Sequence, residues 1–339
     1  MQIVSLSSSL YPAFYQLVQQ TVWGNPMLPE HYNDSLWGDI LLQDSQVVGG
    51  WVGTLRGNHP LTRWLTKSVY FDAYPIFQTP VLEQNYLASL IEAVKQHAEK
   101  ERIVMLNLTH WVRGNCDLPL ETQSVCATFY YDLTLTTEDL YSRLDRLKKR
   151  TIKKAESNPL DVQFYAGRDA LPYISEFQAL REATQARAIE RNKDASMLLK
   201  SDSFFERLFL TQKTTLSVVR LQGKMVAAAT FIESGQTVYA HMSGSDAEAN
   251  RTTGSGTYYY WKAIDYFQQK GLRQFDFGGC PVNPDEHDPA WGVFVFKRGF
   301  GGIYAESREG RMVINPKRYA ILEFLLSQRK LLRIVSRKM

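Results

Sequence analysis

The sequence is poor in cysteine and has no long hydrophobic run. Its 339 residues include three cysteines, and none of them belongs to a Cys-x-x-Cys pair. This argues against a disulfide framework and against a structural zinc cluster. No segment approaches the roughly 18 apolar residues of a membrane-spanning helix, and the first residues lack the basic start and apolar core of a signal peptide. We therefore expect a reduced, soluble protein of the cytoplasm.

Several common catalytic motifs are also missing. There is no G-x-S-x-G elbow and no G-x-x-x-x-G-K-[ST] loop, which disfavours a serine hydrolase and a P-loop NTPase. His287 lies in an acidic loop, Asp285 to Asp288, but without a metal-ligand spacing. Cys280 has no identified base partner and is interpreted as a bystander. We expect no metal and no tightly bound cofactor.

Positive charge is concentrated in one segment. The formal net charge is +4, yet seven basic residues stand against one acidic residue between positions 143 and 154. They are Arg143, Arg146, Lys148, Lys149, Arg150, Lys153 and Lys154. Such a cluster is typical of polyanion binding, and it is equally typical of a solvated helix face.

The two halves of the chain begin alike. Each half predicts a hairpin, a further strand, an amphipathic helix and a closing strand. The hairpins are 40–43 with 46–52 in the first half, and 216–221 with 225–231 in the second. The helices and closing strands are 83–100 with 103–108, and 256–270 with 273–277. This repetition predicts a duplicated α/β domain with a mixed sheet.

The join between the halves is expected near residues 134–140. Residues 128–135 alternate like an edge strand. A single charged helix then begins at Thr136 or Thr137, both good N-caps, and ends near Ser157 before Asn158-Pro159. The predicted domains are therefore 1–135 and 136–339.

The segment Arg251-x-x-Gly254-x-Gly256 follows a predicted strand, 238–242, and opens the helix 256–270. Glycines allow the backbone to approach an anion, and free N–H groups at a helix N-terminus bind phosphate. Arg251 adds a bidentate donor, and Ser255 lies between the glycines. The segment predicts a phosphate cradle, although an ordinary glycine-containing helix start fits the same pattern.

This pattern resembles the pyrophosphate loop of the GNAT acyltransferase superfamily. Two further motifs, F-D-F-G-G at 275–279 and F-K-R-G-F-G-G at 296–302, resemble the FemABX family of peptidoglycan-bridge aminoacyltransferases and their relatives. The basic stretch 150–155 resembles the opening of that family's second domain. The resemblance covers most of the chain and is strongest from 140 to 315. It implies an α/β (α+β) fold with two tandem GNAT-like domains, each a mixed sheet flanked by helices.

The resemblance also implies a reaction. An activated acyl or aminoacyl group would move to an amine, such as that of a peptidoglycan or other cell-envelope precursor. The donor would be aminoacyl-tRNA, held by the basic segment, or acyl-CoA, and peripheral membrane association is compatible with such an acceptor. Two alternatives stay open: a CoA-dependent N-acyltransferase for a sugar nucleotide or surface-glycan precursor, and a non-catalytic polyanion-binding module.

Three residues are candidates for catalysis. By resemblance, Lys297 holds its ammonium against negative charge, with Phe296 beside it, and such a group stabilises an oxyanion. A snorkelling surface lysine would show the same local pattern. Asp276 points away from its phenylalanine neighbours near a strand end, where it would accept a proton from the amine, orient the substrate ammonium or cap the following turn.

Four further residues are candidates for acceptor binding. Tyr239 and His241 share one face of a predicted strand, and a structural role for the histidine fits equally well. Asp72 and Tyr74 follow the first-half strand 69–71 and would line an acceptor groove if the halves face each other. A simple turn is the alternative for this second pair.

Overall fold

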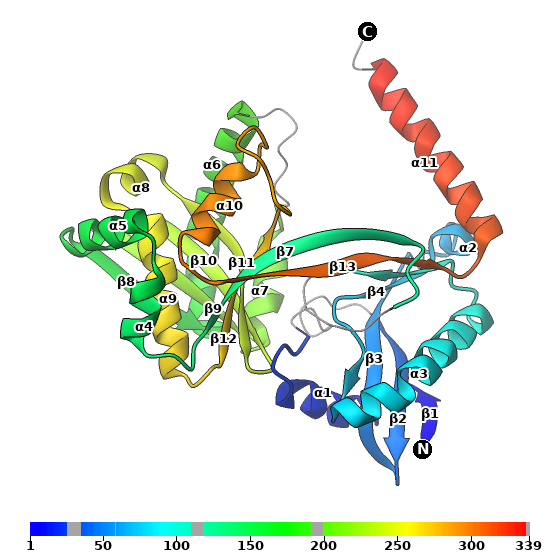
Figure 1. Ribbon diagram of the computed structural model, residues 1–339. Coiled ribbons are helices and arrows are strands. Elements are labelled where there is room, and N and C mark those ends of the chain that lie inside the picture. Colours follow the sequence, from blue (N-terminus) through cyan, green and yellow to red (C-terminus); the bar gives the residue numbers. More distant parts are fainter. Residues whose placement is uncertain (26–34, 58, 110–117, 192–198, 337–339) are drawn as a thin grey trace.

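The computed structural model describes residues 1–25, 35–57, 59–109, 118–191 and 199–336. Within these residues the strands form one large mixed sheet with helices on its faces (Figure 1). The strands follow the order β1-β2-β3-β4-β6-β13-β7-β12-β11-β10-β9-β8, and β5 pairs with β3. The sheet therefore extends through both halves of the chain.

The first half supplies one end of the sheet. Its strands are β1 (Gln2–Ser5), β2 (Ser35–Gln43), β3 (Gln46–Arg56), β4 (Ser68–Phe71), β5 (Ile76–Phe77), β6 (Met105–Leu108) and β7 (Thr122–Asp132). Its helices are α1 (Tyr11–Gln20), α2 (Arg63–Thr66) and α3 (Pro80–Lys100). Helix α3 starts at a capping Thr79, whose hydroxyl accepts the N–H of Leu82, and it buries Leu90, Ile91 and Val94 against the sheet.

The second half supplies the other end. Its strands are β8 (Leu160–Ala166), β9 (Thr214–Leu221), β10 (Lys224–Ser234), β11 (Thr237–Ser245), β12 (Gln274–Cys280) and β13 (Ile303–Val313). Its helices are α4 (Thr137–Arg143), α5 (Arg146–Glu156), α6 (Ile174–Arg191), α7 (Asp202–Leu210), α8 (Ala247–Thr253), α9 (Ser255–Gln269), α10 (Trp291–Arg298) and α11 (Pro316–Ser336). A 3₁₀ turn, Gly167–Tyr173, precedes α6.

The predicted duplication is confirmed. In the first half the order β2-β3-β4-β6 ends in a parallel pair, and in the second half β9-β10-β11-β12 does the same. Helix α3 connects one parallel pair and α9 connects the other. Each connection has the length that a parallel crossover requires. The two halves are thus two copies of one mixed α/β arrangement.

The prediction of an edge strand at 128–135 is wrong. Strand β7 lies in the interior of the sheet, antiparallel to β12 on one side and to β13 on the other. Its alternation has another cause: Ala127, Phe129 and Tyr131 are buried in the core, whereas Thr128 and Tyr130 are half-buried on the opposite face. Strand β13 also pairs with β6, so the sheet is continuous across the predicted boundary. The division into 1–135 and 136–339 stays a prediction.

The predicted single charged helix is two helices. Thr136 caps α4 as expected, but α4 ends at Arg143 and α5 begins at Arg146. Asp145 caps α5 by accepting the N–H of Lys148 at 2.6 Å, and its own N–H donates to the carbonyl of Gly299 at 2.9 Å. The break follows from a second good N-cap residue inside the charged segment.

The two halves pack against each other through the segment after α1. The N–H of Asn25 donates to the hydroxyl of Ser234, and the Thr237 hydroxyl donates to the carbonyl of Val22 at 2.7 Å. A Cβ on Gly24 would lie 2.4 Å from the nitrogen of Gly235, so only glycine permits this contact. The first half is therefore anchored to the β10–β11 hairpin.

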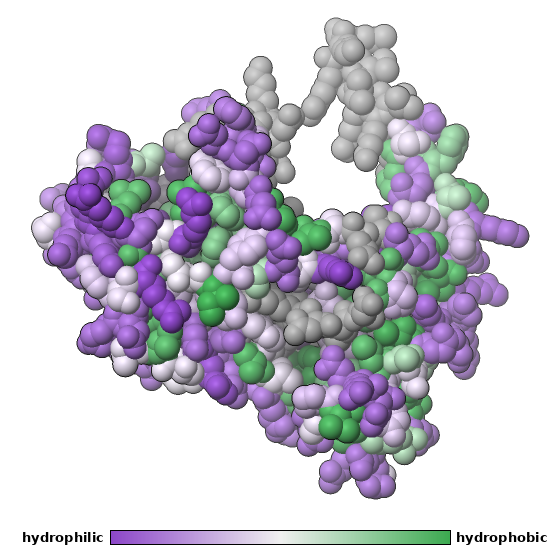
Figure 2. Space-filling model, in the orientation of Figure 1, coloured by the Kyte–Doolittle hydropathy of each residue, from purple (hydrophilic) through white to green (hydrophobic). Residues whose placement is uncertain are grey.

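Helix α11 leaves the body of the molecule at the end of the chain (Figure 1). Figure 2 shows hydrophobic residues gathered along its lower part. Across the described ranges, every helix is too short or too polar to cross a membrane. In the same residues, His, Cys, Asp and Glu side chains form no cluster of three that would hold a metal ion.

Candidate active site

The site begins where two parallel strands separate. Strands β11 and β12 pair over three residues only, from Thr237↔Gln274 to Tyr239↔Asp276. Beyond that point β12 continues alongside β7, with a register shift between Asp276 and Gly279. A cavity of about 880 Å³ opens at the carboxyl ends of the two strands, which is where open sheets bind ligands.

The cavity is built by six elements and one loop. Strands β7, β11 and β12 form its floor, and helices α8, α9 and α10 and the loop after β12 contribute its walls. The predicted residues on its wall are Tyr239, His241, Gly256, Asp276, Phe296 and Lys297. The first half contributes Thr128 from β7, so the site is made by both halves.

The F-D-F-G-G motif shapes the floor. Phe275 and Phe277 are buried in the core, and Asp276 between them is buried on the opposite face. The Asp276 carboxylate accepts the N–H of Gly278 and the hydroxyl of Thr128, each at 2.7 Å. Gly278 has φ +75°, and a Cβ there would lie 2.9 Å from the carbonyl oxygen of Ala240. Asp276 thus caps the turn and also faces the cavity.

Lys297 connects the two motifs. From α10 its Nζ donates to the carbonyls of Gly278 at 2.9 Å and Gly279 at 2.7 Å. The residue is 9% exposed, and burial lowers the pKa of its ammonium to about 8, against an opposing effect of Asp276. An ammonium has three donors, so within the described residues one N–H is left for a ligand. Lys297 is therefore not a snorkelling surface lysine.

Behind Phe296 lies a second buried lysine that the sequence interpretation misplaced. Lys148 of α5 was predicted to belong to the polyanion-binding set, but it is buried, with its Nζ 3.5 Å from the centre of the Phe296 ring. Burial lowers its pKa to about 8, opposed by Asp145. This cation–π contact fixes the wall of the cavity. The rest of the set, apart from half-buried Lys149, is exposed.

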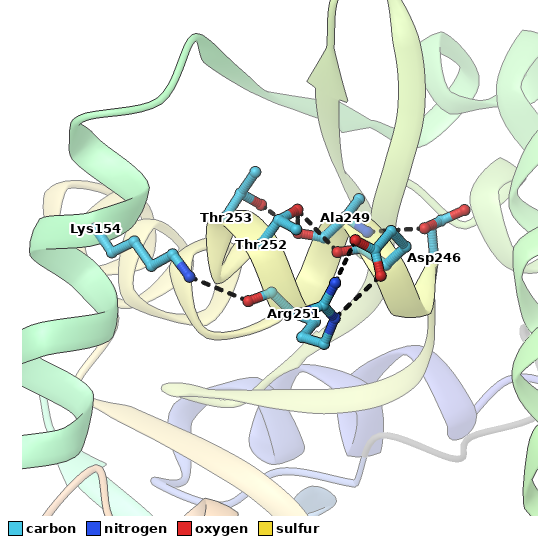
Figure 3. Close-up of polar contacts among 7 residues, drawn as sticks. Lys154, Asp246, Ala249, Arg251, Thr252 and Thr253 are labelled. Carbon is cyan, nitrogen blue, oxygen red and sulfur yellow. Dashed lines mark hydrogen bonds and ion pairs between the residues drawn. The ribbon is translucent and has the colours of Figure 1, made fainter.

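Arg251 lies in a short helix rather than in an open loop. It belongs to α8, and its guanidinium donates to both carboxylate oxygens of Glu248, at 3.0 and 2.6 Å. Its carbonyl accepts from Lys154 of α5 at 3.1 Å (Figure 3). The side chain is 73% exposed, and its ion pair further raises its pKa. The arginine is thus held by its own helix.

The expected free N–H groups at the start of α9 have partners within the chain. The N–H of Ser255 donates to the Thr253 hydroxyl at 3.3 Å, and that of Gly256 donates to Asn250 Oδ1 at 2.8 Å. Gly254 has φ +78°, and a Cβ there would lie 2.5 Å from the Thr151 side chain. The phosphate-binding role of this segment stays a prediction, and it requires Asn250 to turn away.

The four predicted acceptor residues divide into two pairs. Tyr239 is buried and donates to the carbonyl of Trp23, whereas His241 is half-buried with Nδ1 3.4 Å from the Thr230 hydroxyl. Both line the cavity. The other pair lies in the first half and is absent from the described cavity lining.

In that second pair, Asp72 accepts the Thr109 hydroxyl at 2.6 Å, and Tyr74 donates to the carbonyl of Arg308 in β13 at 2.9 Å. These contacts fit the turn interpretation of Asp72 and Tyr74. An acceptor-binding role for either pair stays a prediction.

Comparison with known proteins identifies the class. The family described as "Acetyltransferase (GNAT) domain" matches residues 142–298. A tandem GNAT protein from the clavulanic acid biosynthesis pathway superposes with a TM-score of 0.51 at 13% identity, covering 93% of this chain and 99% of that chain. The chain therefore has a tandem GNAT fold with a GNAT domain in its second half, as predicted.

Two further comparisons bear on the family. The crystal structure of FemX superposes with a TM-score of 0.71 at 14% identity, covering 95% of this chain and all of that chain. The lipid II:glycine glycyltransferase of Staphylococcus saprophyticus is 24% identical over 148 residues. That match spans 42% of this chain and 35% of the relative, about a third of its length. The resemblance to the FemABX family is confirmed.

Proposed function

We propose that this protein transfers an aminoacyl group to the amine of a peptidoglycan precursor. The observation that carries the proposal is the position of Lys297, whose buried ammonium is fixed by two carbonyls at the point where β11 and β12 separate. The GNAT match over this region and the likeness to a lipid II:glycine glycyltransferase support the same reaction class.

In the proposed reaction, the acceptor amine attacks the acyl carbon of an aminoacyl ester. A C–N bond forms, the ester C–O bond breaks, and the proton lost by the amine goes to the departing hydroxyl oxygen. The remaining N–H of Lys297 and main-chain N–H groups at the strand separation stabilise the tetrahedral oxyanion. With no activated nucleophile identified in the sequence, direct attack within a ternary complex is favoured over a covalent enzyme intermediate.

Aminoacyl-tRNA is the donor that we favour over acyl-CoA. A CoA pyrophosphate needs the N–H groups at the start of α9, and Asn250 already accepts that of Gly256. Arg251 is likewise engaged by Glu248. The exposed basic side chains of α5 offer phosphate contacts instead. Charged tRNA places the proposed reaction in the cytoplasm.

The test measures transfer of a labelled amino acid from tRNA to a peptide-bearing peptidoglycan precursor, with labelled acetyl-CoA as the competing donor. We expect transfer from tRNA alone. Lys297→Met is expected to lower kcat by about 10²–10³-fold, as loss of an oxyanion donor does. Lys224→Met, at a hairpin lysine that is 74% exposed, is the matched control. Transfer from acetyl-CoA alone contradicts the donor, and an unchanged rate for Lys297→Met contradicts the mechanism.

A further inference from the structure

Among the described side chains, those that attach helix α11 to the body lie in its N-terminal part, up to Glu323, whose carboxylate contacts Arg311 at 3.5 Å. Arg311 of β13 donates to the hydroxyl of Tyr319, and the guanidinium of Arg318 donates to the carbonyl of Arg102 at 3.4 Å. Helix α2 lies against the same end of α11. The helix then runs outward from the molecule (Figure 1), so its base is fixed while its length is presented to the surroundings.

The outward part of α11 exposes large apolar side chains. Phe324 is 62% exposed, and Ile321, Leu325 and Leu326 are exposed as well. All side chains from 323 to 328 are exposed, and in this stretch Glu323 contacts the body through Arg311 at 3.5 Å. A stable monomer rarely leaves such a contiguous apolar surface uncovered unless it binds something.

A second exposed apolar group lies beside the base of α11. Trp64 of α2 is 51% exposed, and Leu61 just before α2 is 79% exposed. Both precede β4, far from α11 in the sequence, yet the fold brings α2 against α11. We call Leu61, Trp64, Ile321, Phe324 and Leu325 the α11 patch. Two independent segments therefore present apolar side chains in one region.

The charge of the helix indicates what covers this patch. The sequence of α11 contains five basic residues and one acidic residue, Glu323. The basic residues are Lys317, Arg318, Arg329, Lys330 and Arg333. A basic amphipathic helix with neighbouring tryptophan is suited to an anionic lipid surface, where apolar side chains enter the interface and lysine and arginine meet the headgroups. Two copies of such a helix would instead bring like charges together.

We propose that α11 and α2 form a docking surface for an anionic membrane, with the α11 patch inserted at the interface. None of the patch residues lines the cavity, so the docking goes beyond the proposed transfer reaction and does not depend on it. On such a surface the protein would meet acceptors that are linked to lipid.

The test is co-sedimentation of the full-length protein with vesicles of phosphatidylcholine alone and of phosphatidylcholine with phosphatidylglycerol. We expect binding to the anionic vesicles only, and weaker binding at high salt. The double variant Phe324→Asp/Leu325→Asp is expected to lower the partition by about tenfold or more. Val81→Asp is the control. Val81 is an equally exposed apolar residue, at 64%, but it lies at the start of α3, and the other end of that helix is the one near α2, where Lys67 contacts Glu101.

Circular dichroism and a thermal melt establish that the double variant is folded, and amino-acid transfer to a water-soluble acceptor is measured in parallel. Wild-type protein that does not bind anionic vesicles overturns the proposal, as does a double variant that binds like Val81→Asp. A lipid-free dimer that the double variant makes monomeric, with no vesicle binding, assigns the patch to self-association and also overturns it. If the double variant still transfers the amino acid to the water-soluble acceptor, the outcome of the vesicle experiment concerns membrane docking alone and leaves the proposed function untouched.

Discussion

At the scale of single residues, the site is distinguished by two buried lysines. Lys297 lines the cavity, Lys148 lies against the ring of Phe296, and burial lowers the pKa of each to about 8. One ammonium is held by two carbonyls and the other by aromatic rings. Ordinary lysines remain charged well above pH 9. The charge of this cavity is therefore sensitive to mildly alkaline pH.

The pH dependence of transfer follows from Lys297. Its ammonium is present below its pKa and is lost as pH rises through about 8. If the ammonium stabilises the oxyanion, kcat/KM of the wild type falls as pH rises through this range, because this profile reports the free enzyme. Lys297→Arg retains its charge, so its lower activity should not fall there. A wild-type kcat/KM that does not fall through this range, or a Lys297→Arg variant with the same fall, would contradict the electrostatic role.

The sequence predicted Lys297 but not the residues that constrain it. Lys297 was found because it lies in a distinctive motif, F-K-R-G-F-G-G, whereas Lys148 lies in a run of basic residues and carries no signal of its own. Asn250, which fills the expected phosphate cradle, precedes Arg251 in an ordinary polar stretch. Such roles depend on which side chains meet after folding, and spacing along the chain does not encode these contacts.

At the scale of elements, glycine turns hold the helices around the site. Gly301 has φ +75°, and a Cβ there would lie 2.0 Å from the carbonyl oxygen of Arg143 at the end of α4. A Cβ on Gly299 would lie 2.5 Å from the carboxylate of Asp145. The F-K-R-G-F-G-G turn is thereby pressed against the α4–α5 break. Close contact favours glycine at both positions, and at Gly301 the positive φ requires it as well.

Gly301→Ala should destabilise the protein by about 2 kcal/mol or more, since it adds a clash to the cost of a positive φ. Gly223→Ala is the matched control, because Gly223 has φ +81° and no atoms near the added Cβ. That control should lose about 1 kcal/mol, from φ strain alone. The free energy of unfolding in urea measures both. Equal losses in the two variants would show that the α4 contact is not tight.

The basic face of α5 gives a test of tRNA binding. Arg146, Arg150 and Lys153 are exposed, whereas Lys148 is buried and is left unchanged. Reversing the three exposed charges to Glu should weaken tRNA binding. It should also reduce the slope of log K against log salt by roughly 2, since each phosphate contact contributes about 0.7–0.9. The measurement is a salt titration of tRNA affinity.

The control for this experiment is a triple reversal at Arg168, Arg207 and Lys224, which are exposed elsewhere in the second half. This control changes the net charge by the same amount as the α5 variant. Because its charges lie away from α5, the slope of log K against log salt for tRNA binding should stay near that of the wild type. If the two triple variants lose similar amounts of tRNA affinity, the basic side chains of α5 are a solvated helix face and not a tRNA-binding site.

At the scale of the whole molecule, β7 and β13 join the halves. Both strands are 11 residues long, and β13 pairs with β7 on one side and with β6 on the other. The duplicated units could be predicted because their hairpins and helices are local. The insertion of β13 could not, because a strand at the end of the chain pairs with strands almost 200 residues away, and periodicity does not report such partners.

Removal of residues 303–339 should therefore unfold both halves. The truncation takes away β13 and leaves one edge of β6 and one edge of the longer β7 unpaired. Truncation after Asn315 keeps β13 and is the control, which we expect to be folded. Circular dichroism and urea unfolding distinguish the two. A cooperative urea transition of the second half in the variant that lacks residues 303–339 would contradict this prediction, because it would show that the second half folds without β13.

The position of β13 also constrains how the protein is made. A ribosome delivers the chain from its N-terminus, so both strands that pair with β13, β6 and β7, are synthesised before β13 itself. Until β13 emerges, β6 and β7 each keep an open strand edge, and such edges are prone to pair with other chains. The pairing of β13 with β6 and β7 is thus a late, non-local step of the kind that slows folding. In nascent chains of this protein, the segments that need chaperone protection for longest should be β6 and β7 at the centre of the sheet, rather than the strands at its outer edges.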